Sequence, residues 1–317
     1  MKKIFVFSFI IVCILQSFIF IKFDGVDFNM WADQAKYVQT NNPIQFDYRQ
    51  AYGHPGGPII EGTIFLHSLF DLSYKNSLLI FLIFIDAIIV SSISILCFSL
   101  SKNNLWWPIT LATLSASWLY IFSSPPSIIA SLLICLLALF SIYLYKEKEI
   151  QTKHLTLFGL LIGFMIATRT DIGGIFGLTF LIFLKSKISW RQFYFILFCI
   201  AISFILLDPF MWFIPIEHLG DLVFKIVYHY EYFSEPSKVS IPHILSISSF
   251  AVMSILFSGL FLIKRKNFES DIPKRFILSA IIATVVLCSI FLTSIFQSPR
   301  YFLPLILLWE TLLPAFV

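Results

Sequence analysis

Apolar runs near 20 residues recur along almost the whole chain, separated by short polar segments. A run of about 20 apolar residues is the length that an α-helix needs to cross the hydrocarbon core of a bilayer. We therefore expect an all-α, polytopic membrane protein, with one membrane-embedded domain over residues 1–317 and about 10 transmembrane helices. The expected spans are residues 4–23, 77–100, 105–122, 127–145, 155–168, 172–184, 193–214, 241–263, 276–296 and 301–317.

The longest polar interval, residues 24–76, lies between the first two apolar runs. Within it, Asp27 is placed to cap a helix that ends before Asn41-Asn42-Pro43, and Pro58 suits the first turn of a second helix. The first of these helices has an apolar stripe at spacings of three and four, formed by Phe28, Trp31, Ala35 and Val38. We expect two interfacial helices that cover the membrane surface, with Asp33 and Lys36 on the polar side of the first.

A second polar interval, residues 215–240, is rich in aromatic side chains and also carries acidic residues and histidines. Aromatic residues at this depth usually form a belt at the membrane interface, and a substrate-binding role is the alternative.

Residues 155–184 contain a polar interruption, Arg169-Thr170-Asp171, followed by Gly173-Gly174. One long helix here would invert every later loop, so we expect two short helices that meet at this polar turn. The turn brings Arg169 and Asp171 toward a cavity, or else it is an ordinary external turn.

Composition supports the membrane assignment, since 58% of the 317 residues are hydrophobic and only 13% are charged. A soluble domain carries roughly 25% charged residues. The five cysteines lie within apolar runs, which gives neither a disulfide framework nor a metal-binding pattern. The net charge of +4 comes from basic residues beside apolar segments, so we expect them to set topology rather than to bind nucleic acid.

The distribution of Lys and Arg predicts the orientation. The first span follows Met1-Lys2-Lys3 and lacks a signal-peptidase site, so we expect it to be retained with the N-terminus in the cytoplasm. Fourteen of the 22 basic residues then fall on the inner side and eight on the outer side. The interval 24–76 is therefore expected outside, on a bacterial inner membrane.

Four segments resemble motifs of the GT-C glycosyltransferases, in particular the protein-mannosyltransferase and aminoarabinose-transferase-like group. Asp33-Gln34-Ala35-Lys36-Tyr37 resembles the family's Asp-Glu-Ala-x-Tyr pattern, although its second acidic residue is Gln34 here. The turn at 52–58 resembles a His-Pro-Pro-Leu turn, with His54-Pro55-Gly56-Gly57-Pro58 in its place. Residues 163–170 are similar to a span ending in Thr-Arg-Pro, and 300–304 to an Arg-Tyr-Leu-Leu-Pro segment. Family members usually run well beyond 317 residues.

The resemblance implies transfer of a sugar from a polyprenyl-phosphate donor to a glycan, lipid or protein acceptor. We expect no cofactor and assign no metal ligand, and the dependence of the reaction on a metal ion stays open. Such a site needs a carboxylate for the acceptor's proton and fixed cations for the lipid phosphate. We expect Asp33 to be the carboxylate, although it can instead be a solvated partner of Lys36. Phosphate and substrate ligands are expected among Arg169, Arg300, Tyr301, His54, Glu61 and Asp27. Either arginine can instead reach lipid headgroups, Asp27 can be only a cap, and His54 can only shape its loop.

Two other function classes stay open. Asp86 and Glu310 lie within apolar runs, where burying an acid is costly, and helices interrupted at Gly173-Gly174 suit an ion-coupled transporter or a lipid flippase. The chain also stops inside an apolar run, which is compatible with an inactive, truncated remnant.

Overall fold

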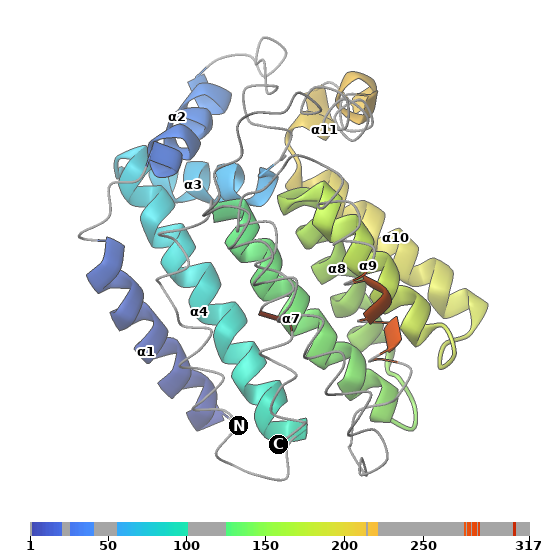
Figure 1. The fold of residues 1–317 in the computed structure, drawn as a ribbon. Coiled ribbons are helices and arrows are strands. Elements are labelled where there is room, and N and C mark those ends of the chain that lie inside the picture. The colour runs from blue at the N-terminus through green and yellow to red at the C-terminus, as the bar shows by residue number, and fades with distance from the viewer. Residues whose placement is uncertain are drawn as a thin grey trace, which may run out of the picture.

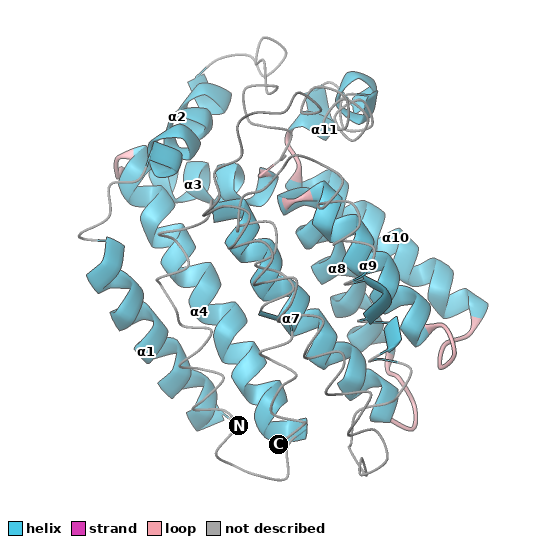
Figure 2. Cartoon of the chain, in the orientation of Figure 1, coloured by secondary structure: helices cyan, strands magenta, loops and turns pink. Residues whose placement is uncertain are grey.

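The structure is a computed structural model, and it describes residues 2–20, 26–40, 56–100, 125–213 and 215–220, with 276, 278–279, 281–283, 285 and 307–308. Every regular element in these residues is helical, and no strand occurs among them (Figure 2). The expected all-α class is therefore confirmed for the described part. The spans expected at 105–122, 241–263 and, almost entirely, 276–296 and 301–317 lie outside the described residues.

Six helices lie side by side in a bundle (Figure 1). Three of them are long and apolar enough to cross a membrane, namely α4 (Tyr74–Leu100), α7 (Pro125–Lys146) and α10 (Trp190–Leu207). The others are α1 (Lys2–Phe20) and two shorter apolar helices, α8 (Thr152–Thr168) and α9 (Thr170–Leu184). The chain therefore has the helices of a multi-pass membrane protein, and the two expected short helices are both present.

Two helices lie across one end of this bundle, at the top of Figure 1. They are α2 (Val26–Thr40) and α3 (Gly57–Phe70), which we call the roof. The bounds agree with the two helices expected in the interval 24–76, except that α2 begins one residue before Asp27. This residue therefore lies inside the first turn instead of preceding it as a cap, and its side chain is outside the described residues.

The apolar stripe of α2 packs against protein. Phe28, Trp31 and Ala35 are almost fully buried, and α2 contacts both α3 and α4. Asp33 and Lys36 lie on the exposed side, as the periodicity predicts. The stripe therefore fixes α2 to the top of the bundle.

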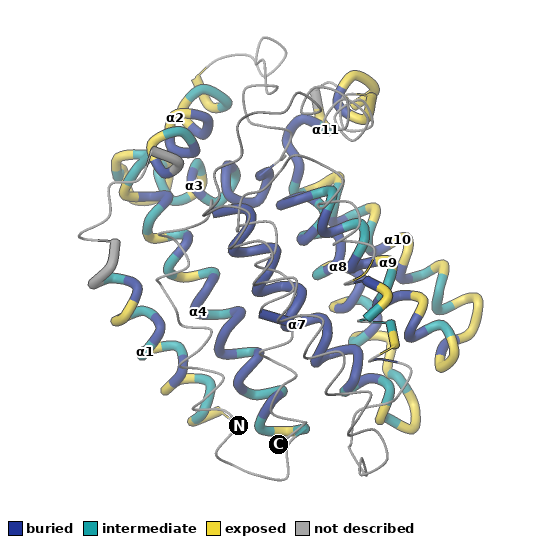
Figure 3. The backbone as a smooth tube through the Cα atoms, in the orientation of Figure 1, coloured by how far each residue is buried: buried dark blue, intermediate teal, exposed yellow. Residues whose placement is uncertain are grey.

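The burial of residues decreases from the centre of the bundle toward its outer helices (Figure 3). Almost every residue of α7 is buried, because α4, α8 and α9 all pack around it. Large apolar side chains of α1 and α10 point outward instead, among them Phe7, Ile10, Phe198 and Leu206. An outward apolar surface on two outer helices is what contact with lipid tails requires.

Small residues allow α8 and α10 to pack closely. A Cβ atom on Gly159 would lie 2.6 Å from the Cβ of Cys199, and one on Gly163 would lie 2.5 Å from the carbonyl oxygen of Ile200. Between them, the hydroxyl of Ser203 donates to the carbonyl of Leu160 at 2.8 Å. Glycines four residues apart provide such close contact between membrane helices.

The ends of α10 are both explained by local sequence. At its start, the Ser189 hydroxyl accepts from the Gln192 amide at 3.3 Å, and the Gln192 side chain accepts from the Ser189 amide at 2.9 Å. At its end, Asp208 adopts an extended conformation before Pro209, as the residue before a proline prefers. The expected span 193–214 is therefore too long: the helix stops at Leu207, and a separate short helix, α11 (Phe210–Phe213), follows.

From α7 to α10 successive helices alternate in direction, so the described connections divide between two ends of the bundle. The turns at Asp71–Ser73, Arg169 and Asp208 lie at the roof end, and the connections at 147–151 and 185–189 lie at the other end (Figure 1). The second end carries Lys146, Lys148, Lys153, Lys185, Lys187 and Arg191.

Candidate functional site

The break between α8 and α9 consists of one extended residue, Arg169, with φ −153° and ψ 102°. Its amide donates to the carbonyl of Met165 at 2.9 Å, and its carbonyl accepts from the amide of Gly173 at 2.8 Å. The same residue therefore closes α8 and opens α9. Its side chain projects from the roof end of the bundle toward the start of α7.

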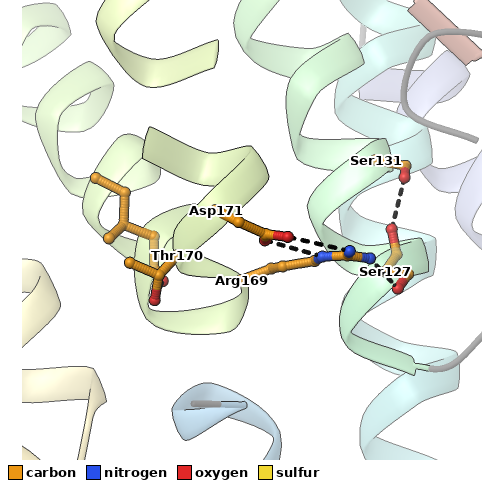
Figure 4. A network of polar contacts seen from close by, with 6 residues as sticks. Ser127, Ser131, Arg169, Thr170 and Asp171 are labelled. Carbon is orange, nitrogen blue, oxygen red and sulfur yellow. Dashed lines mark hydrogen bonds and ion pairs between the residues drawn. The ribbon is translucent and has the colours of Figure 1, made fainter. Parts of the chain in front are cut away.

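The Arg169 guanidinium is fully buried and bound on two sides (Figure 4). Its Nε and Nη2 donate to the two carboxylate oxygens of Asp171 at 3.0 and 3.2 Å, and Nη1 donates to the Ser127 hydroxyl. The Asp171 side chain is 37% exposed, so one partner of the buried arginine has access to water. The structure thus withdraws Arg169 from bulk water.

Two glycines at the start of α3 join the ends of α8 and α10. The amide of Gly56 donates to the carbonyl of Thr168 at 3.3 Å. A Cβ on Gly57 would lie 2.1 Å from the carbonyl oxygen of Leu207 and 2.9 Å from the Cα of Asp208. The close approach needs glycine at position 57, and it brings Arg169 and Asp208 to two sides of one turn.

Helix α2 of the roof also covers Gly56. It has a positive φ of 57°, and a Cβ there would lie 2.1 Å from the Trp31 ring. The indole of Trp31 therefore closes over this turn, and its Nε1 is buried without a hydrogen-bond partner. Gly56 and Gly57 thus have a packing reason.

Asp208 forms a second buried polar contact at the roof end, with His218. Its Oδ2 lies 2.7 Å from Nε2 of His218, and both side chains are fully buried. Its Oδ1 accepts from the amide of Phe210 at 3.1 Å, which holds the carboxylate at the start of α11. His218 belongs to the helical residues 215–220 that follow.

Glu61 lies one turn into α3, on the side of Gly57. Its Oε1 is buried and has no hydrogen-bond partner. Burial and, second, the negative charge of Asp208 raise the pKa of the Glu61 carboxyl to about 8. This group lies outside the three spanning helices and exchanges its proton near neutral pH.

The structure brings only part of the expected site together. Arg169 and Glu61 lie near the glycine turn, whereas Asp33 is on the exposed face of α2. His54, Arg300 and Tyr301 lie outside the described residues, as does the side chain of Asp27. The four phosphate- or substrate-binding assignments among these residues stay predictions.

Asp208 and His218 were missed as site residues. The sequence contained a signal for Asp208, because an acid followed by a proline near the end of an apolar run commonly ends a helix. His218 gave no such signal, since its contact with Asp208 depends on how the chain folds back after α10.

The arrangement offers one buried cation, one buried carboxylate held by a histidine, and one carboxyl with an unpartnered oxygen. No group of three or more His, Cys, Asp or Glu side chains among the described residues is suited to hold a metal ion. This set of groups can bind an anion and transfer a proton.

Comparison with protein-family models, with curated proteins and with solved structures finds no match to this chain.

Proposed function

We propose that the chain is a membrane glycosyltransferase that moves a sugar from a polyprenyl-phosphate donor to a glycan, lipid or protein acceptor. The reaction takes place at the roof end, on the outer face of a bacterial inner membrane, and the N-terminus lies in the cytoplasm. The resemblance of four segments to GT-C enzymes supports this proposal, as does the concentration of polar groups at one end of the bundle.

The observation that carries the proposal is the burial of Arg169 beside the glycine turn. Sugar transfer leaves a lipid phosphate whose charge must be offset by a fixed cation, and a planar guanidinium binds phosphate through two parallel hydrogen bonds. In the resting protein the Asp171 carboxylate occupies these donors. Because Asp171 is partly exposed, it can turn toward water when a phosphate arrives.

The transporter alternative depends on an acid inside a spanning helix. Asp86, near the middle of α4, is fully buried and accepts a hydrogen bond from the side chain of Gln16 in α1 at 2.9 Å. This contact joins two helices that pack along their length, so it supports helix pairing rather than an ion path.

The test is substitution of Arg169 by lysine, which keeps the charge and removes the planar fork. Loss of a charge-assisted bond costs about 1–3 kcal/mol, so we expect the KM for the lipid donor to rise roughly 5- to 150-fold. The measurement uses the purified full chain in nanodiscs with a panel of labelled undecaprenyl-phosphate monosaccharides and with added membranes that contain envelope acceptors. Release of undecaprenyl phosphate together with transfer of the label separates a transferase from a flippase, which leaves the donor intact.

The matched control is Arg191→Lys, because Arg191 is exposed and lies at the opposite end of the bundle. Its KM should equal that of the wild type. An unchanged KM in Arg169→Lys would reduce Arg169 to a structural partner of Asp171. Failure of the wild type to cleave any donor of the panel would reject the proposed function.

A further inference from the structure

The described carboxylates at the roof end differ in how they are held. All except Glu61 are either exposed to water or bound to a partner: Asp33, Asp71 and Glu217 are exposed, and Asp171 and Asp208 are paired with Arg169 and His218. Glu61 is partly buried, and its Oε1 has no hydrogen-bond partner. A buried carboxyl oxygen without a partner carries a free-energy cost that a native structure usually avoids.

Glu61 also lies on the side where the buried polar contacts are. It follows Gly57 by four residues, which places both on one face of α3, and Gly57 contacts the end of α10 at Asp208. Asp33 occupies the exposed face of α2, while Trp31 on the buried face covers Gly56. A helix is about 10 Å across, so a sugar held near Arg169 is separated from Asp33 by the body of α2.

We propose that Glu61, rather than Asp33, accepts the proton of the acceptor during sugar transfer. This inference rests on the proposed function and specifies its base. The acceptor oxygen or nitrogen forms a bond to the anomeric carbon as the bond from that carbon to the phosphate oxygen breaks. The bonding electrons leave with the polyprenyl phosphate at Arg169, the acceptor's proton passes to Oε1 of Glu61, and water later removes it.

The electrostatics of the site support this role. A general base works best when its pKa lies near the working pH, because it then holds a proton strongly and is still partly ionised. The pKa of Glu61, raised to about 8, meets this condition. Burial is the larger cause, and the Asp208 charge is the second.

The groups facing Glu61 come from four neighbouring helices. From α10, Asp208 acts on it directly and is itself held by His218. At the end of α8, Arg169 is neutralised by Asp171. Helix α2 presents Asp33 and Lys36 to water.

The fourth neighbour, α4, contributes two charged residues. Lys75 lies in its first turn, beside the far end of α3, and Asp86 lies three turns further along the helix, in contact with Gln16. Among the described residues, the charge that contributes to the raised pKa of Glu61 is therefore the negative charge of Asp208, which favours uptake of a proton.

The experiment compares Glu61→Gln, Glu61→Asp and Asp33→Asn in the same nanodisc assay, at matched protein level and melting temperature. Membranes that contain envelope acceptors are added with the labelled undecaprenyl-phosphate monosaccharides. We expect transfer by Glu61→Gln to fall by about 10² or more, the contribution of a general base, and Glu61→Asp to recover part of it. Asp33→Asn should retain the wild-type rate.

The pH profile provides a readout that a purely structural residue would not change. The wild-type rate should rise with pH, reach half of its maximum near pH 8 and level off above that pH. Asp208→Asn removes the neighbouring negative charge, so the rise should move to lower pH. This profile decides the question even where Glu61→Gln does not accumulate, and a flat wild-type profile overturns the assignment.

The remaining outcomes are distinct. Loss of transfer in Asp33→Asn with normal transfer in Glu61→Gln assigns the base to Asp33 and overturns the inference, while the proposed function stands. Normal transfer in both variants also overturns it. If the wild type transfers no sugar, the proposed function and the inference both fail.

Discussion

Three side chains at the roof end are wholly or partly buried, namely those of Arg169, Asp208 and Glu61. The cost of burying each one is offset in a different way. Arg169 is bound by a carboxylate and a hydroxyl, and Asp208 by an imidazole and a backbone amide. Glu61 has no such partner for its buried oxygen, and it reduces the cost of burial by holding a proton. A buried group that cannot be paired commonly responds in this way.

Glu61 should make the stability of the protein depend on pH. Its pKa is raised on folding from 4.5 to about 8, so between these values the folded state binds more protons than the unfolded state. The free energy of unfolding should therefore fall as pH rises through this window and level off above it. Thermal unfolding of the detergent-solubilised chain at several pH values measures this trend.

Glu61→Gln is the matched variant, because glutamine keeps the shape of the side chain and does not titrate in this window. Its melting temperature should depend less on pH than that of the wild type. Equal pH dependence in the two proteins would mean that Glu61 is ionised in the fold.

At the scale of residues, the sequence predicted where side chains lie better than it predicted which of them belong to the candidate site. The periodicity of α2 correctly placed Asp33 on the exposed side and Trp31 on the buried side. It could not show that the charge of Asp208 would act on Glu61, because the two residues are almost 150 positions apart in the sequence. Sequence alone does not show which of two carboxylates the fold partly buries, the one in a motif, Asp33, or the other, Glu61.

Several elements at the roof end make their closest backbone approaches at glycines. Gly57 allows α3 to touch the carbonyl of Leu207, and a Cβ atom on Gly173 would lie 2.8 Å from the carbonyl oxygen of Met165. Since backbone atoms cannot move aside as a flexible side chain does, these positions fix the distances between helices.

Gly57→Ala should therefore separate α3 from α10. The added methyl group would lie 2.1 Å from a carbonyl oxygen, and an overpacked site of this kind typically costs about 1–3 kcal/mol. Gly174→Ala is the matched control, because a Cβ there meets nothing within 4 Å and alanine favours a helix by about 1 kcal/mol over glycine. Melting temperatures of the two variants should move in opposite directions, and equal shifts would contradict the contact.

The sequence predicted the helices of the described part well and their contacts less well. The two short helices on either side of Arg169 followed from length and charge bias. The close pairing of α8 with α10 was readable in the spacing of Gly159 and Gly163 but depends on the partner surface at Cys199 and Ser203. The end of α10 was placed seven residues too late, because hydropathy alone does not register the break at Asp208-Pro209.

The whole molecule is asymmetric from end to end. The roof end carries the buried polar contacts and the covering helices, while the other end carries most of the described Lys and Arg residues. Charge bias predicts that the basic end lies in the cytoplasm. In the structure, the described segments that the sequence assigns to the inner side lie together at the basic end of the bundle. The described segments that it assigns to the outer side lie together at the roof end.

Single cysteines test this orientation. Ser73 is exposed at the roof end and Thr152 is exposed at the basic end, so each can report on its side of the membrane. In a background without the five native cysteines, Ser73→Cys should react with an impermeant maleimide in intact cells, and Thr152→Cys should react only after permeabilisation. The reverse pattern would place the roof in the cytoplasm and exclude an outer-face reaction.

The shortness of α8 and α9 also affects the surrounding bilayer. With 17 and 15 residues they are about 25 and 22 Å long, whereas a typical hydrocarbon core is about 30 Å thick. Such hydrophobic mismatch is relieved by thinning of the membrane beside the short helices. A lipid phosphate at the roof end would thereby lie nearer to the level of Arg169 than it would beside a helix of full length.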